Sequence, residues 1–185
     1  CLFDTFGDDE TDEVLENALE FRRYSRTLPE RFREQTDRIF ACWEENRAEL
    51  EKCYAHLPAS VFQADLNDTN VLLDEEGRFA GIYDFNLAGK DVFLNYLFRE
   101  IYEGSFDQER NEILTALKIC TAVYTFSEAE KEAALPLYRC LKPLWFTRVE
   151  ALKDAENDAA AIQQCLDDME RAQTQNIDFR SAMEG

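Results

Sequence analysis

The feature that most limits how this chain can fold is a long apolar stripe between residues 30 and 57. Its large apolar side chains recur about every 3.6 residues, so they lie along one face of a helix. The members of the stripe are Phe32, Ile39, Phe40, Trp43, Leu50, Tyr54 and Leu57. Pro29 suits the first helical position, and Pro58 ends the run. We therefore predict a long amphipathic helix over 30–57.

Further helical patterns flank this stripe on both sides. Before it, 11–26 is a predicted helix, capped by Thr11, with Val14, Leu15, Ala18 and Leu19 facing inward. The later predicted helices span 91–103, 108–127, 129–152 and 155–174. Pro136 and Pro143 are expected to break or kink the third of these. Trp43, Trp145, Phe85, Leu87 and Phe93 are expected to pack in the core.

The apolar period changes between these two helical regions. Residues 60–62 are short and β-like, and residues 71–73 and 79–83 are apolar runs separated by turn residues at 74–77. A β-hairpin over 71–83 is therefore predicted. The expected fold class is mainly α with a small β-hairpin element.

Composition favours one soluble, folded domain. The chain has 185 residues, of which 45% are hydrophobic, and this is too much apolar bulk for a disordered protein even at a net charge of −19. The acidity disfavours broad contact with nucleic acid or with an anionic membrane, but it is compatible with a cationic substrate. The acidic helix faces are expected to be solvated. These faces carry Glu44, Glu45, Glu49 and Glu51.

The cysteine and histidine content limits which metal sites and catalytic groups the chain can form. Six cysteines without a C-x-x-C pair predict a reduced, cytoplasmic protein. His56 is the only histidine, which argues against His-rich metal sites and histidine-based triads. Cys53 shares a helical face with His56, but two ligands do not make a zinc site. Because the sequence opens at Cys1, we expect it to be part of a longer protein.

The stretch at 61–86 is dense in carboxylate and amide side chains, and a calcium loop is one interpretation. Asp65, Asn67 and Glu76 fit positions 1, 3 and 12 of the EF-hand template. Thr69 is a poor ligand, Asn70 stands where the template needs glycine, and the flanks are β-like. These departures weigh against the calcium interpretation.

A magnesium-dependent phosphoryl-transfer site is the other interpretation. Such a site needs a group that orients or deprotonates the attacking hydroxyl, and metal ligands that offset the phosphate charge. Mg²⁺ takes one or two carboxylates from protein, with phosphate and water completing its shell. Asp65, Asn70 and Asp84 form the pattern D-x-x-x-x-N, hairpin, D, and the hairpin would return Asp84 beside the other two.

The stretch "FQADLNDTNVLLDEEGRFAGIYDFNLAGKD" resembles the catalytic and metal-binding segment of the aminoglycoside phosphotransferase and choline kinase-like family. The resemblance implies a protein kinase-like α+β fold, of which this chain would be the C-terminal, helical lobe. It assigns catalysis to Asp65 and metal binding to Asn70 and Asp84, with Gln63 and Asn67 in the supporting loop. It also implies Mg²⁺, ATP as co-substrate and a small-molecule hydroxyl acceptor, such as an aminoglycoside or choline.

The chain departs from that family in two ways. Gln63 replaces the usual His, and the Gly positions after Gln63 and Asp84 hold Ala64 and Asn86, which indicates a divergent branch. No G-x-G-x-x-G is present, so we expect the N-terminal nucleotide-binding lobe to be absent.

The predicted organisation is one domain over 1–185. It would have helices over 1–57, the catalytic loop and metal-binding hairpin over 58–90, and helices over 91–185. We expect the intact parent to be a kinase and this chain alone to be inactive. The nucleotide-binding residues stay unassigned. The alternative is a non-catalytic kinase-like scaffold that binds a ligand or partner.

Overall fold

The apolar stripe forms the longest helix of the computed structural model, which describes residues 13–63, 66–101 and 104–184. A 3-10 turn, η1 (Glu30–Phe32), leads into α2 (Arg33–Tyr54). All seven predicted members of the stripe are buried, which confirms the predicted face. Pro29 precedes η1 as its N-terminal cap and does not occupy the first helical position.

The first helix, α1 (Glu13–Ser25), packs against α2 and α6. Val14 and Ala18 are buried as predicted, but Leu19 is 42% exposed, so its assignment to the core was wrong. Phe21 is fully buried, because it lies three residues after Ala18 on the face that meets the body. The predicted cap Thr11 lies outside the described residues.

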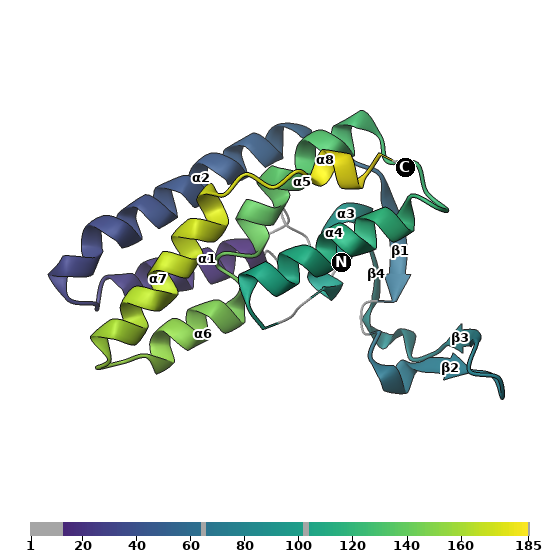
Figure 1. Cartoon of the computed structure of the whole chain (residues 1–185), viewed down its shortest axis with the longest axis horizontal. Coiled ribbons are helices and arrows are strands. Elements are labelled where there is room, and N and C mark those ends of the chain that lie inside the picture. Colours follow the sequence, from purple (N-terminus) through teal and green to yellow (C-terminus); the bar gives the residue numbers. More distant parts are fainter. Residues whose placement is uncertain (1–12, 64–65, 102–103, 185) are drawn as a thin grey trace.

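The remaining helices form the body of the molecule around α2 (Figure 1). They are α3 (Phe93–Glu100), α4 (Phe106–Cys120), α5 (Glu128–Leu141), α6 (Phe146–Asp154), α7 (Ala159–Thr174) and α8 (Phe179–Ala182). Ser127 and Glu130 form a capping box that starts α5. Pro143 separates α5 from α6 as predicted, whereas Pro136 lies inside α5 without ending it. None of the helices in the described ranges is long and apolar enough to cross a membrane.

Helices α5 and α7 cover one side of α2 and close the core. Trp43 is buried there, and its Nε1 donates a hydrogen bond to the carbonyl oxygen of Cys140 at 3.0 Å. Trp145 is also buried, so both tryptophans pack in the core as predicted. The acidic side chains of α2 that were expected to be solvated are exposed.

Two separate antiparallel strand pairs follow α2. Strand β1 (Ala59–Gln63) pairs with β4 (Ala88–Val92), with Ala59 opposite Val92 and Gln63 opposite Ala88. The predicted hairpin forms from β2 (Val71–Leu73) and β3 (Phe79–Ile82), and it projects away from the helical body (Figure 1). Strand β4 was not predicted. The predicted fold class, mainly α with a small β-hairpin element, is confirmed.

Candidate functional site

Four of the predicted site residues lie around the junction where β1 ends and the hairpin returns to the body: Gln63, Asn67, Asn70 and Asp84. Gln63, the last residue of β1, is buried with 4% of its surface exposed. Its Nε2 donates hydrogen bonds to the carbonyl oxygen of Asp84 at 2.8 Å and, at 3.4 Å, to that of Tyr83. The side chain of Gln63 therefore fixes the backbone at the carboxyl end of the hairpin.

Asn70 reaches the same junction from the other end of the hairpin. It closes the 3-10 turn η2 (Asp68–Asn70), which Asn67 caps by accepting a hydrogen bond from the backbone N–H of Thr69 at 3.0 Å. The N–H of Asn70 donates to the carbonyl of Asn67, and the N–H of Tyr83 donates to the carbonyl of Asn70 at 3.1 Å. Asn70 thus lies directly across the hairpin base from the residue that precedes Asp84.

Asp84 has a left-handed backbone conformation, with φ 60° and ψ 71°. This region is unfavourable for residues with a Cβ, although Asp and Asn tolerate it best, and such outliers concentrate at functional sites. The side chain of Asp84 is exposed, and no described residue hydrogen-bonds to its carboxylate. Its oxygens are therefore free to bind a cation. Phe85 is 57% exposed, so the prediction that it packs in the core was wrong.

Tyr96 supports the site from α3, a role that the sequence did not reveal. The Tyr96 hydroxyl donates to the carbonyl oxygen of Gln63 at 3.0 Å, and its ring stacks on Phe62 with a centroid distance of 4.1 Å. Burial raises the pKa of Tyr96, so the hydroxyl keeps its proton over the physiological range. Its position three residues after Phe93 indicated a shared helical face, but nothing in the pattern indicated its hydrogen-bond partner.

Asp91 is a second support missed by sequence reasoning. It lies in β4, where its carboxylate accepts hydrogen bonds from the Tyr54 hydroxyl at 3.1 Å and from Asn95 Nδ2 at 2.8 Å. Burial raises the pKa of Asp91, whereas these hydrogen bonds lower it. The contacts join α2, β4 and α3 beneath the site.

The predicted catalytic residue, Asp65, lies outside the described residues. The described residues of the proposed calcium loop do not support the calcium interpretation. The carboxylate of Glu76 pairs with Arg78 at 2.9 Å, and Asn67 caps η2. Strands flank this segment where an EF-hand has helices.

Two oxygen-bearing side chains of the described site, those of Asn70 and Asp84, match the ligand chemistry of Mg²⁺. Magnesium prefers oxygen ligands and takes few of them from protein. Within the described ranges no group of three or more His, Cys, Asp or Glu side chains could hold a metal. One carboxylate and one amide suit an ion whose shell is completed by phosphate and water.

A comparison with protein-family profiles matches residues 4–95 to the phosphotransferase enzyme family (APH). Residues 4–95 are therefore similar to that family. The segment includes Gln63, Asn70 and Asp84, and it ends within α3. This similarity indicates a kinase-type enzyme in general terms. No curated protein and no solved structure matches the chain.

Proposed function

We propose that this protein forms part of a magnesium-dependent kinase that transfers a phosphoryl group from ATP to a hydroxyl of a small molecule. An aminoglycoside or a choline-like alcohol is the acceptor class that the sequence resemblance suggests. The observation that carries the proposal is the junction at the hairpin base. There a buried Gln63 holds the carbonyl of Asp84, and Asn70 lies across from Tyr83.

The proposed roles follow from the chemistry of each side chain. Asp65 orients the acceptor hydroxyl and accepts its proton, as a carboxylate near the attacking oxygen can do. Asn70 and Asp84 hold Mg²⁺, which when bound would offset the negative charge of the phosphates. Gln63 keeps the backbone of Asp84 in place, and Asn67 shapes the turn that ends at Asn70.

We further propose that the chain of 185 residues is inactive by itself and that a nucleotide-binding lobe from the same protein completes the site. The sequence contains no G-x-G-x-x-G, the pattern that covers ATP phosphates in kinases. Transfer from ATP by the 185-residue chain alone would contradict this part of the proposal.

The test compares three variants of a longer form that carries sequence upstream of Cys1. Asp84→Asn should weaken Mg²⁺–nucleotide binding as well as kcat, because it removes a charged metal ligand. Asp65→Asn should lower kcat by about 10²–10⁴ with little change in nucleotide Kd, because only the proton acceptor is lost. Glu75→Gln is the control, since Glu75 is an exposed carboxylate in the turn of the same hairpin.

Nucleotide Kd is measured by calorimetry with Mg²⁺, kcat by phosphate transfer, and folding by circular dichroism. A folded Asp65→Asn variant that keeps most of its kcat would refute the catalytic assignment. Mg²⁺–nucleotide binding without any turnover in the unaltered protein would favour a non-catalytic scaffold. The replacement of the usual His by Gln63 is the observation that keeps this second candidate.

A further inference from the structure

A cavity of about 370 Å³ lies at the end of the molecule opposite the hairpin. Its lining residues come from the α1–α2 corner and from the α6–α7 turn. Figure 1 shows where these two segments lie. Its volume falls within the usual range for small-molecule sites. None of its lining residues belongs to the candidate phosphotransferase site, so it is a separate place for a ligand.

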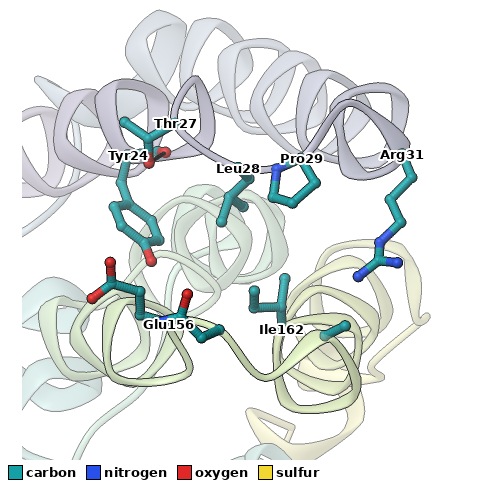
Figure 2. Close-up of a pocket in the computed structure, with 9 residues that line it drawn as sticks. Tyr24, Thr27, Leu28, Pro29, Arg31, Glu156 and Ile162 are labelled. Atoms are coloured by element: carbon teal, nitrogen blue, oxygen red, sulfur yellow. Dashed lines mark hydrogen bonds between the residues drawn. The ribbon is translucent and has the colours of Figure 1, made fainter.

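The middle of this cavity is apolar and belongs to the core. Leu28 and Ile162 point toward each other across it, with Pro29 beside them (Figure 2). Both Leu28 and Ile162 are buried, so they form a fixed floor. An apolar floor favours a ligand with a hydrocarbon middle over one that is polar throughout.

The two ends of the cavity carry opposite charges. The Tyr24 hydroxyl lies near Glu156 at one end, and the guanidinium of Arg31 points toward the other end (Figure 2). No carboxylate in the described part of the chain forms an ion pair with Arg31, and no described cation pairs with Glu156. Both side chains are exposed, and the Arg31 guanidinium also lies 4.7 Å from the centroid of the Phe32 ring. A ligand in the cavity can reach both charges from solvent.

The walls of the cavity are held in place by contacts outside it. Lys153 Nζ bridges Glu20 of α1 and Glu150 of α6 at 2.8 Å each. Asp158 caps α7 by accepting hydrogen bonds from the N–H groups of Ala160 and Ala161. The cavity therefore lies between tied elements, and a ligand would meet walls that are already formed.

We propose that this cavity binds a small zwitterion, an aminocarboxylic acid whose carboxylate lies at Arg31 and whose ammonium lies at Glu156 and Tyr24. A planar guanidinium suits a carboxylate, because it can donate two parallel hydrogen bonds. The hydrocarbon middle of the ligand would cover Leu28 and Ile162. This inference does not depend on the proposed phosphotransferase function.

The overall charge of the protein favours a zwitterion over a simple anion. At a net charge of −19 the protein repels anions at long range. A ligand without net charge avoids this repulsion and still presents a carboxylate to Arg31. Burial and the charge of Glu156 raise the pKa of Tyr24, so its hydroxyl stays protonated near neutral pH. It donates to the carbonyl oxygen of Lys153 at 3.4 Å, and its oxygen can accept a hydrogen bond from the ammonium.

The test titrates the protein with aminocarboxylates of increasing length: glycine, β-alanine, γ-aminobutyrate and ε-aminocaproate. Binding is followed by amide chemical shifts and calorimetry. We expect affinity to peak at one length, because both charged ends must be reached together. Caproate and pentylamine, which each lack one charge of ε-aminocaproate, should bind more weakly by about tenfold or more.

Substitutions at the two charged ends of the cavity give a second test. Arg31→Gln and Glu156→Gln should each weaken the best ligand by about tenfold. Arg31→Gln should also abolish the preference for that ligand over the amine that lacks its carboxylate. Arg33→Gln and Asp154→Asn are the matched controls, since these exposed residues change the charge nearby without lining the cavity.

The proposal is overturned if no member of the series shifts the amides of the cavity. It is also overturned if the single-charge analogues bind as tightly as the zwitterion, or if the control variants weaken binding as much as the cavity variants. Circular dichroism checks that each variant is folded.

Discussion

The left-handed backbone of Asp84 offers a direct test of the candidate site. The side chain is exposed and makes no hydrogen bond with the described residues, so replacing it leaves the packing of the core unchanged. Its carbonyl stays bound to Gln63 in every variant, because that hydrogen bond uses the backbone. Substitutions at Asp84 therefore report mainly the cost of a positive φ.

The size of this cost can be worked from the backbone angle. At φ 60°, a residue with a Cβ costs roughly 1–2 kcal/mol relative to the right-handed form, a cost that glycine does not have. Glycine loses about 0.5–1 kcal/mol more conformational entropy on folding. Asp84→Gly should therefore be as stable as the unaltered protein or up to about 1 kcal/mol more stable. Asp84→Asn should be as stable as the unaltered protein. Asp84→Ala should be about 1 kcal/mol less stable than Asp84→Gly.

Thermal unfolding followed by circular dichroism measures the order of the three variants. For a domain of this size, 1 kcal/mol shifts Tm by about 2–4 °C. The same Gly variant should lose Mg²⁺–nucleotide binding in the longer form of the protein, since it lacks the proposed metal ligand. An Asp84→Ala variant that melts at or above Asp84→Gly would show that the left-handed conformation carries no strain, and would refute this reasoning.

Three further predictions concern stability. Gln63→Leu should lower the free energy of unfolding in urea by about 1–3 kcal/mol, because the Asp84 carbonyl loses its buried hydrogen-bond donor. Gln63→His should lower it less. Equal losses in the two variants would contradict the hydrogen-bond account. Burial lowers the pKa of Lys142 to about 8, so between pH 8 and 10.5 the unfolded state binds more protons than the folded state. Over this range the free energy of unfolding should rise with pH relative to that of Lys142→Met. A difference in unfolding free energy between the two proteins that does not change with pH would contradict this. Pro136→Ala should raise Tm, because it restores a backbone donor to the carbonyl of Glu132 inside α5; an unchanged or lower Tm would count against it.

The helical part of the fold was predictable because it depends on local periodicity. The stripe along α2 places its side chains on one face whatever they pack against, and all of its members are buried. Leu19 was assigned wrongly because an apolar side chain at the edge of a stripe can face solvent. Strand β4 was missed because Ala88–Val92 has little β-branched character, and it becomes a strand by pairing with β1.

The sequence was enough to predict that Asn70 and Asp84 lie at one junction, but not which residues support that junction. The spacing of Asn70 and Asp84 around a hairpin was enough to bring them to one junction, because antiparallel pairing fixes which ends meet. The hydrogen bonds of Gln63 and Tyr96 join segments that are distant in the sequence, so no local pattern could reveal them.

The burial of Lys142 and Glu109 as a pair in the core could not be predicted from local sequence patterns either. Both side chains belong to segments with ordinary amphipathic patterns, where charged residues normally face solvent. In the structure both are almost completely buried, and Lys142 Nζ lies 3.4 Å from Glu109 Oε2 and donates to the carbonyl oxygen of Ile101 at 2.5 Å. One ammonium thus joins the start of α4, the end of α5 and the residue that follows α3. Since α3 also carries Tyr96, which holds Gln63, this charge pair helps to fix the helix on which the site rests. A periodicity argument assigns each of these residues to a face of its own helix, but the link from the core to the site exists only in the three-dimensional arrangement.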